Sequence, residues 1–449
     1  MKINRKVKMN IERIKSIVLA LLVLFSLALT WGLWTFQPQY DFGQKANSLQ
    51  TVIGEKRQFN EVIRPTQYIY HQDQFIYGLT DYLLTDEIYQ MVMDVNVLEY
   101  EHITFSSKEQ LQIILTNQSS LEFLFPVSLP IGISNYIMAP IKQEWDINYF
   151  NRIVVSFSKD PAIYYISGGD EQAIKLKVDA SEISEIKDKV MKVDYQKSAY
   201  FSVGGKDGRT LYLPENRVVL RQLTFSTQNI PSSDFKNALF SDPNGLKKFD
   251  LNNGEESFTD GTKALEISQN QSMMRFINPA NQEIYDLEPD EMILKSIEFI
   301  NDHSGWTDTF TLMNWSKANH NVQFRLMVDG YPVFSEDGST TIYQSWRDNE
   351  IYEYVRSLTN LRFSIDNEQK RLILPSGREL LSYLSQVKPD FTLNSLEAVF
   401  IGYEFTQEGM NTNVITIEPK WYIKYDGKWE GIFIPSTAIG QGGSDLGLE

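Results

Sequence analysis

The feature that most constrains this chain is one uninterrupted apolar run near its beginning. Between Ser16 and Tyr40 no residue is charged, and the stretch IVLALLVLFSLALTWGLWTF, Ile17 to Phe36, is 20 residues long. As a helix with a rise of about 1.5 Å per residue, this stretch would extend roughly 30 Å, the thickness of the hydrocarbon core of a bilayer. The run therefore predicts a membrane-spanning helix over residues 16–37.

The end of the run distinguishes a cleaved signal peptide from a permanent anchor. A secretory signal has a shorter apolar region, about 7–15 residues, and ends in small residues of the A-x-A kind. Here the run ends in Trp31, Trp34 and Phe36, which suit a membrane–water interface, and Pro38 follows them. We expect an uncleaved anchor with these three aromatic residues at the outer membrane interface; a cleaved signal is the alternative.

Charge is divided unevenly between the beginning of the chain and the remainder. Residues 1–15 contain six bases and one acid, a net of +5, whereas the whole chain of 449 residues carries −16. Basic residues beside a membrane helix mark its cytoplasmic side, so residues 1–15 are predicted to be a cytoplasmic head and the bulk of the chain to be extracytoplasmic. Because nucleic acid requires a basic face, this acidic body predicts no nucleic-acid partner.

One face of the predicted helix carries small residues at a spacing that allows another helix to approach closely. Small side chains bring helix backbones together, and hydroxyl groups can bond across the contact. Such rows also occur in membrane helices that pair with nothing, so both interpretations stay open. The face consists of Ser16, Ala20, Ala28 and Gly32 on one i+4 row, with Ser26 and Thr30 on a neighbouring row.

The remainder of the chain predicts an α+β body of several domains. A length of 449 residues exceeds one ordinary core. The absence of cysteine excludes disulfides, a thiol nucleophile and a cysteine-based zinc site. The predicted segments are a connector at 38–60, an N-terminal α+β domain at 61–228, a central α+β domain at 229–341, a C-terminal α+β domain at 342–437 and a flexible tail at 438–449.

Short patterns predict individual elements of the body. The stretches RPTQYIYHQDQFIYGL, RIVVSFSKDPAIYYI and YFSVGGKDGRTLYL each contain two strand-like runs around a turn and predict hairpins. Helices are predicted for SEISEIKDKV and for SSKEQLQIILTN, which begins with a capping box formed by Ser106 and Glu109.

A weak internal repeat relates the central and C-terminal domains. ALEISQNQSMMRFINP resembles LRFSIDNEQKRLILP, each predicted to form a hairpin around a polar turn, and VQFRLMVDGYPVF resembles KWYIKYDGKWEGIF. Pro279 and Pro375 are 96 residues apart, and Asp329 and Asp426, each followed by glycine in a hairpin turn, are 97 apart. The matching offsets favour two related domains in tandem, with LKSIEFI and LEAVFIGYEF as strands between the paired segments.

Helices are predicted to open each repeated unit. PSSDFKNALF precedes the first unit. SWRDNEIYEYVRSL precedes the second unit. It is predicted to be a helix because apolar residues recur at i, i+3, i+4 and i+7 from Ile351. A further helix in the second unit begins at the capping box of Ser376 and Glu379.

No pattern of catalytic, metal-binding or cofactor-binding residues stands out. The four histidines lie far apart, each interpreted as an ordinary surface or half-buried residue, and the chain contains neither HExxH nor a Gly-rich phosphate-binding motif. The Ser-x-x-Lys matches SFSK and SEIK lack the partner motifs of penicillin-binding enzymes, and DLNNGEESFTDG departs from an EF-hand loop at its glycine and its last position. We therefore predict a protein that is not an enzyme and has no catalytic, metal or cofactor residues.

Three features together resemble the YycH family: the anchor edge LTWGLWTFQPQYD, the length of the chain, and the closing EPKWYIKYDGKW. Members of this family are accessory proteins of the essential cell-wall sensor histidine kinase YycG, also called WalK, of low-GC Gram-positive bacteria. The resemblance implies one N-terminal transmembrane helix, an extracytoplasmic body of three domains with the last two related, and no enzymatic activity. It also implies two protein partners, the kinase YycG/WalK and the sister protein YycI, with kinase contact through the membrane helix, here residues 16–36.

Two functional hypotheses follow. In the first, the chain is a membrane-anchored regulator of a two-component kinase that controls cell-wall metabolism, with the kinase, YycI and the lipid bilayer as partners. In the second, its outer domains bind or sequester a wall fragment or a peptide. A third class, an anchored wall enzyme, would need a clustered nucleophile and base that the sequence does not reveal. The sign of any regulation, activating or inhibiting, is left open.

Overall fold

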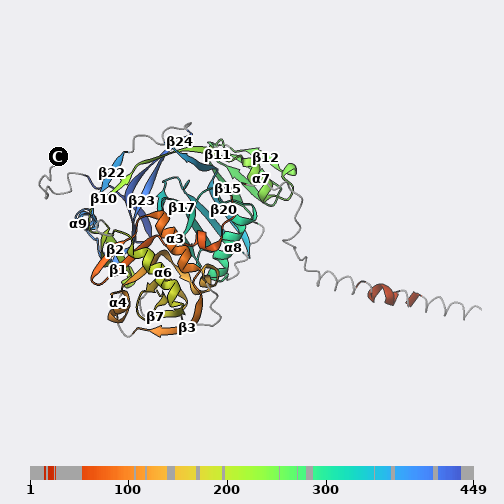
Figure 1. Cartoon of the computed structure of the whole chain (residues 1–449). Helices are drawn as coiled ribbons and strands as arrows, with labels where there is room; N and C mark the ends of the chain where they lie inside the picture. Colours follow the sequence, from red (N-terminus) through yellow and green to blue (C-terminus); the bar gives the residue numbers. More distant parts are fainter. Residues whose placement is uncertain are drawn as a thin grey trace, which may run out of the picture. The chain divides into compact units, whose positions relative to one another are not determined.

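The computed structural model describes residues 15–16, 19–24, 26, 53–105, 108–116, 119–138, 147–167, 172–194, 198–251, 253–270, 272–279, 287–347, 349–365, 370–407 and 413–435. The chain divides into two compact units, residues 1–49 and residues 50–449. The described residues of the first unit are helical. The second unit combines long sheets with a few helices, which confirms the predicted α+β class (Figure 1).

The first part of the body is a nine-stranded antiparallel sheet with the spatial order β3-β7-β6-β5-β4-β1-β2-β8-β9. The three hairpins predicted here, β1–β2, β5–β6 and β8–β9, are confirmed. The strands are β1 (Gln67–Gln72), β2 (Phe75–Gly78), β3 (Val97–Thr104), β4 (Ser120–Pro130), β5 (Tyr149–Ser156), β6 (Ala162–Ile166), β7 (Gln172–Val178), β8 (Ala199–Gly204) and β9 (Thr210–Pro214).

Helices cover both faces of this sheet because side chains alternate along each strand. Ile153 and Val155 of β5 pack in one core with residues of α3 and α6, whereas Val154 packs with Leu111 of α4 in a separate cluster. The predicted helices α4 and α6 are confirmed, although the capping residue Ser106 lies outside the described residues. The helices of this part are α2 (Phe59–Val62), α3 (Tyr82–Met93), α4 (Lys108–Thr116), α5 (Ser134–Ile137) and α6 (Ala180–Met191), with short 3-10 turns η1 (Ile131–Ile133) and η2 (Lys206–Gly208).

The second part is built on a fourteen-stranded sheet with the order β12-β13-β14-β15-β20-β19-β17-β18-β23-β24-β11-β21, in which β16 pairs with β17 and β25 with β24. Its pairs are antiparallel except β18–β23, and a separate ribbon joins β10 to β22. The strands are β10 (Val218–Arg221), β11 (Leu223–Asn229), β12 (Lys247–Asp250), β13 (Glu256–Thr259), β14 (Ala264–Ile267), β15 (Met273–Ile277), β16 (Phe310–Ser316), β17 (Asn321–Val328), β18 (Tyr331–Phe334), β19 (Thr341–Arg347), β20 (Glu350–Ser357), β21 (Thr359–Ser364), β22 (Arg371–Leu374), β23 (Leu396–Gln407), β24 (Val414–Tyr425) and β25 (Lys428–Ile432).

Helices pack against this second sheet at two places. Residues of α8 share a core with β17, β19 and β20, and Leu380 and Leu384 of α9 pack with β9, β23 and β24. The predictions of α7 and of α9 are confirmed, and Ser376 forms the capping box with Glu379. The helical elements of this part are α7 (Ser232–Leu239), α8 (Pro289–Asp302) and α9 (Gly377–Val387), with 3-10 turns η3 (Pro243–Gly245) and η4 (Leu393–Ser395).

Two segments adopt the opposite type of structure from the one predicted. SWRDNEIYEYVRSL forms parts of β19 and β20 around a turn at Asn349, whose φ is 62°, and not a helix. Because β20 lies between β15 and β19, its Tyr354 and Val355 have strand partners on both sides. LKSIEFI lies inside helix α8 and is not a strand, since Pro289 at the first turn and the acids Asp290 and Glu291 start the helix upstream.

The repeated segments agree with the structure in part. The predicted hairpin β14–β15 is confirmed, and the Asp-Gly turns of β17–β18 and β24–β25 both have positive φ at Asp and Gly. LRFSIDNEQKRLILP is not a hairpin, because β21 pairs with β11 and β22 with β10, so that both run antiparallel to one segment, residues 218–229.

One feature of the fold relates the predicted central and C-terminal domains. A helix followed by three antiparallel strands occurs twice, as α8-β16-β17-β18 and as α9-β23-β24-β25. The fourteen-stranded sheet runs across the predicted boundary at 341/342. At the start of the body, Glu55 forms a bridge with Trp306. The domain boundaries and the duplication stay predictions.

Candidate functional site

The residues predicted to contact a partner helix lie at the beginning of the chain. Ser16, Ala20 and Ser26 are described, and all three are helical and exposed. The rest of that predicted face and the aromatic interface, Ala28, Thr30, Gly32, Trp31, Trp34 and Phe36, lie outside the described residues. Among the residues that the structure describes, no helix is both long enough and apolar enough to cross a membrane. The anchor and its pairing face therefore stay predictions.

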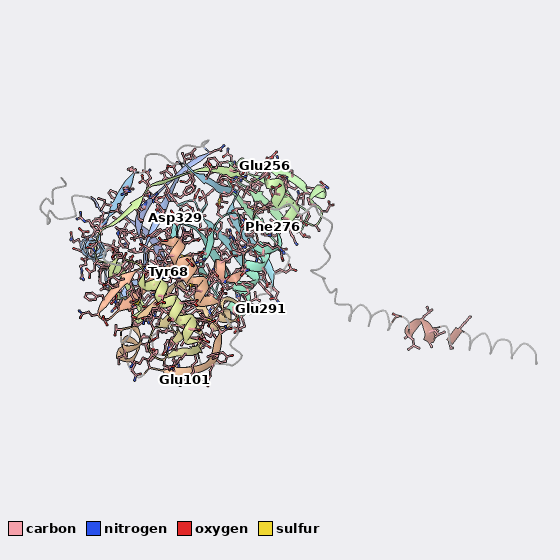
Figure 2. The ribbon with its side chains drawn as sticks, in the orientation of Figure 1. Tyr68, Glu101, Glu256, Phe276, Glu291 and Asp329 are labelled. Carbon is pink, nitrogen blue, oxygen red and sulfur yellow. The ribbon has the colours of Figure 1, made fainter. Side chains whose placement is uncertain are left out.

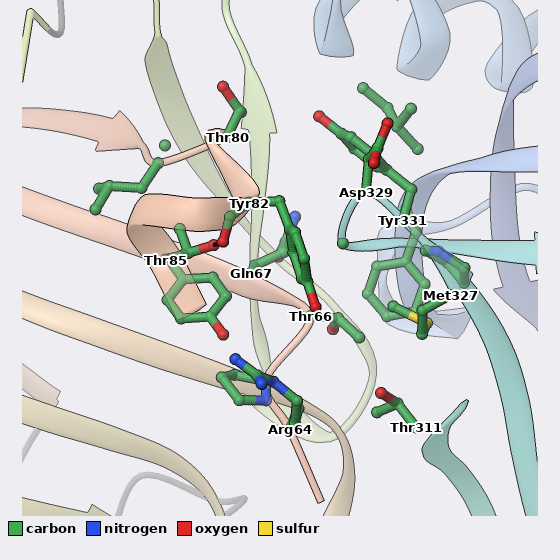
Figure 3. Close-up of a pocket in the computed structure, with 18 of the residues that line it drawn as sticks. Arg64, Thr66, Gln67, Thr80, Tyr82, Thr85, Thr311, Met327, Asp329 and Tyr331 are labelled. Carbon is green, nitrogen blue, oxygen red and sulfur yellow. Dashed lines mark hydrogen bonds between the residues drawn. The ribbon is translucent and has the colours of Figure 1, made fainter. Parts of the chain in front are cut away.

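Within the body, a small pocket of about 80 Å³ lies where the two sheets meet. Tyr68 of β1 and Asp329 of the β17–β18 turn, both labelled in Figure 2, line it from the first and the second sheet. Figure 3 shows the side chain of Tyr82, at the start of α3, between these two walls. A volume of this size holds a few water molecules, since one water needs roughly 10–15 Å³ on this measure.

Arg64, in the polar wall of the pocket, is held in place by residues of helix α3. Nη1 of Arg64 lies 2.5 Å from Oδ1 of Asp86, and its guanidinium stacks over the ring of Tyr89. Burial raises the pKa of Tyr68 to about 12, so its phenol stays neutral beside Arg64. Arg64 is thus a structural cation that anchors α3 to the start of β1.

The opposite wall depends on a turn that only glycine fits well. Gly330 has a φ of 80°, and a Cβ added there would lie 3.0 Å from Cδ2 of Tyr82. The sequence Asp329-Gly330 therefore serves both the hairpin and the contact between sheets. None of the residues that line the pocket is Ser, Cys, His or Lys.

A cluster of buried charges lies inside the nine-stranded sheet. The carboxylate of Glu122 on β4 is fully buried; it accepts hydrogen bonds from Nη1 of Arg152 at 2.7 Å and from the hydroxyl of Tyr212 at 2.7 Å, and lies 2.9 Å from Nε2 of His71. Burial alone would raise the pKa of Glu122, but these three partners lower it to about 2. The cluster joins four strands, β1, β4, β5 and β9, and leaves no reactive group open to solvent.

A second buried cluster lies beneath helix α8. The guanidinium of Arg356 on β20 is 1% exposed and donates to the carbonyl oxygen of Gly305, to the hydroxyl of Tyr354 at 3.1 Å and to that of Thr307 at 2.8 Å. Nε2 of His303 lies 3.5 Å from the same Tyr354 hydroxyl. Burial and the nearby cation lower the pKa of His303 to about 3, so this imidazole is neutral.

The sequence predicts His71 and His303 to be ordinary histidines, and neither cluster was predicted. The available signal was local: His71 lies in the aromatic and aliphatic run YIYHQ, where its neighbours Tyr70 and Ile69 are buried, and Glu122 interrupts the apolar run LEFLF. An acid or histidine inside such a strand is normally paired when buried. Which residues form the pairs depends on strand order, and strand order is not visible in one sequence.

The geometry thus defines the class of protein: it is a large α+β protein with two extended sheets, and its buried polar clusters are structural. Among the described side chains, no group of His, Cys, Asp and Glu residues is placed to hold a metal ion.

Comparison with known proteins identifies the family. Residues 12–195 match the family described as "YycH protein, N-terminal domain", and residues 208–436 match "YycH protein, C-terminal domain". This chain belongs to the YycH family, as the sequence resemblance predicted.

Two relatives extend the comparison. A Bacillus subtilis (strain 168) protein described as "Two-component system WalR/WalK regulatory protein YycH" is 24% identical over 465 residues, covering 98% of this chain and 100% of that protein. The crystal structure of YycH from Bacillus subtilis is similar with a TM-score of 0.69 and 20% identity, covering 84% of this chain and 98% of that chain. The structural likeness supports the fold.

Proposed function

We propose that this chain is a membrane-anchored, non-enzymatic regulator of a WalK-type sensor histidine kinase that controls cell-wall metabolism. The observation that carries the proposal is the full-length match to the Bacillus subtilis WalR/WalK regulatory protein. A match along both chains supports a shared role better than a match to one domain would, because anchor and body are both included. The interior clusters agree with a structural role, since each buried charge is engaged by packing partners.

The proposed membrane arrangement rests on the sequence alone. Residues 1–15 form a basic cytoplasmic head, residues 16–37 span the bilayer, and Trp31, Trp34 and Phe36 lie at the outer interface. The body is then extracytoplasmic, and the sister protein YycI binds beside it.

In the proposed mechanism, the small-residue row formed by Ser16, Ala20, Ala28 and Gly32 packs against a membrane helix of the kinase. In a helix of 3.6 residues per turn, the predicted contacts Ser26 and Thr30 are two residues from Ala28 and belong to the other side. An accessory helix shifts a kinase between signalling states only by the difference between its affinities for the two states. The outer body sets the orientation of the helix and so biases that difference.

The test separates the anchor from the body. A reporter of kinase output is measured in cells that lack the gene and carry the full chain, residues 1–40 alone, or the body on an unrelated membrane anchor. The proposal expects that the body on a foreign anchor does not restore the output of the full chain. Full restoration by that chimera would overturn the role of the membrane helix.

A matched pair of variants tests the helix face itself. Replacing Ala28 and Gly32 by leucine fills the proposed contact and should reduce co-purification with the kinase. Replacing Leu19 and Val23 by phenylalanine adds the same number of carbon atoms on the side of the helix opposite Ala28 and Gly32, and should leave co-purification unchanged. Equal behaviour of the two pairs would contradict the assigned face.

A further inference from the structure

A groove of about 950 Å³ lies in the described part of the body. One wall comes from the ends of β11, β21, β23 and β24, including Thr227, Leu361, Phe405 and Ile415. The other wall comes from the β14–β15 turn, from the turn between β18 and β19, and from Phe310 at the start of β16. Its volume lies at the upper end of the range of pockets that hold small organic ligands, about 300–1,000 Å³.

The lining of the groove is mostly polar and contains no basic residue. Ten of the 18 lining residues carry a hydroxyl or carboxamide group, three carry carboxylates, and none is Lys, Arg or His. The carboxylates belong to Glu255, Asp308 and Asp337. Because no basic residue lines the groove, the carboxylates of Glu255 and Asp337 give it a negative potential, which disfavours phosphates, sulfates and other anionic ligands. Asp308 lies near the buried cation Arg356.

Some of these polar groups are already used and others are not. Asp308 is engaged, because its carboxylate accepts hydrogen bonds from the amide of Leu361 and from the hydroxyl of Thr307. The side chains of Glu255, Gln269 and Asn413 have no ion pair or hydrogen bond with any other part of the chain that the structure describes, and Oγ of the partly buried Ser339 also lacks a partner. The groove therefore offers unused donors and acceptors on both of its walls.

Aromatic and aliphatic side chains complete the lining. The ring of Phe405 and the side chain of Leu361 are partly exposed, whereas Phe310, Leu326 and Ile415 are buried in the core. A ligand that fits must combine many hydroxyl donors and acceptors with apolar faces and carry no negative charge. Pyranose rings have this combination, because their hydroxyl groups project around the edge and their C–H groups form the two faces.

We propose that this groove binds a neutral oligosaccharide of a few pyranose rings. Its carboxylates accept hydrogen bonds from the sugar hydroxyls, its carboxamides donate and accept them, and the partly exposed ring of Phe405 packs against a sugar face. This binding site is independent of the proposed regulation of a kinase, and it requires neither the membrane helix nor a protein partner.

The experiment measures binding of three probes to the full chain in a detergent that has no sugar head group. Isothermal titration calorimetry is performed with chitotetraose, which is neutral, with tetragalacturonate, which is anionic, and with pentalysine, which is cationic. The proposal expects saturable binding of chitotetraose and none of tetragalacturonate or pentalysine. Absence of chitotetraose binding overturns it, and binding of pentalysine alone would assign the groove to a cationic peptide instead.

Two groove variants and a matched control locate the binding. Asn413→Trp and Gln269→Trp each place a large ring at an exposed groove position, and each should weaken chitotetraose binding at least about tenfold, or about 1.4 kcal/mol. Asn319→Trp makes the same change at an exposed turn residue that does not line the groove. Unchanged affinity in both groove variants, with unchanged thermal unfolding, would overturn the assignment of the site.

Discussion

The two sheets of this protein bury charge in opposite ways. In the nine-stranded sheet, the fully buried Glu122 is neutralised by the cation Arg152 and further bonded by Tyr212. In the fourteen-stranded sheet, Arg356 is as deeply buried but donates to a backbone carbonyl and to neutral hydroxyl groups. Within the described chain, no carboxylate forms an ion pair with Arg356.

This difference determines how strongly the stability of each cluster depends on any one of its residues. An ion pair in a low-dielectric interior is held by one strong attraction, so losing either charge leaves the other uncompensated. A cation held by several dipoles has its stabilisation spread over many groups, and it lowers the pKa of any base nearby. His303, whose pKa is lowered to about 3 by burial and by Arg356, is the consequence of the second arrangement.

The largest expected effect comes from breaking the ion pair. Arg152→Met leaves the Glu122 carboxylate buried without its cation, and we expect a loss of about 3–5 kcal/mol in the free energy of unfolding. Adding Glu122→Gln removes the stranded charge, so the double variant should lose less than the sum of the two single losses. Urea unfolding followed by tryptophan fluorescence measures all three variants. Strictly additive losses would show that the opposite charges are not what stabilises this cluster.

The pH dependence separates the two clusters, because they lose stability in different windows. His303 takes up a proton in the unfolded chain near pH 6.5 but in the folded chain only near pH 3, so its contribution is lost as the pH falls from about 6.5 towards 3. Between pH 6.5 and 5 the loss is about 1.6 kcal/mol, because the slope is half of 1.36 kcal/mol per pH unit at pH 6.5 and reaches the full value only below it. Glu122, whose pKa is lowered to about 2, contributes above about pH 4.5 and loses its contribution only as the pH falls from there to about 2.

A pair of histidine variants isolates the first window. His303→Phe should flatten the dependence of unfolding free energy on pH between 6.5 and 5, since it removes the group that titrates differently in the two states. His320→Asn, in the turn that links β16 to β17, is the control and should keep the slope of the parent. An unchanged slope in His303→Phe would contradict the assignment of a neutral buried imidazole.

Much of the local structure could be predicted from the sequence because local chemistry decides it. The Asp-Gly turns, the capping box at Ser376 and the β-branched and aromatic runs of β5 and β6 each contain the residues that their geometry requires. At SWRDNEIYEYVRSL the local pattern fitted a helix, and neighbouring strands decided otherwise. β-branched and aromatic residues with partners on both sides follow the sheet, whatever their helical periodicity.

The buried clusters and the groove could not be predicted in the same way. Glu122 and Tyr212 are 90 residues apart, and they meet because the β8–β9 hairpin closes one edge of the first sheet. The groove is lined by turns and strand ends that are distant in sequence and individually look like ordinary polar loops. The predicted face of small residues is a property of a single helix, which is why it could be proposed from spacing alone.

The smallest expected effects compare the two Asp-Gly turns and test whether the two sheets are held together at Tyr82. Gly427 has a φ of 78° and no atom within 4 Å of an added Cβ, so Gly427→Ala should cost only the backbone strain, about 1 kcal/mol. Gly330 has nearly the same φ, but its added Cβ would press on the ring of Tyr82, and overpacking adds about another 1 kcal/mol. Thermal or urea unfolding of the two variants gives the difference directly.

Introducing Tyr82→Ala together with Gly330→Ala should remove this extra cost when the pair is compared with Tyr82→Ala alone, because the ring that the new methyl group meets is gone. Equal losses in Gly330→Ala and Gly427→Ala would show that the turn is free to move away from α3, and that the contact at the pocket does not hold the sheets in place.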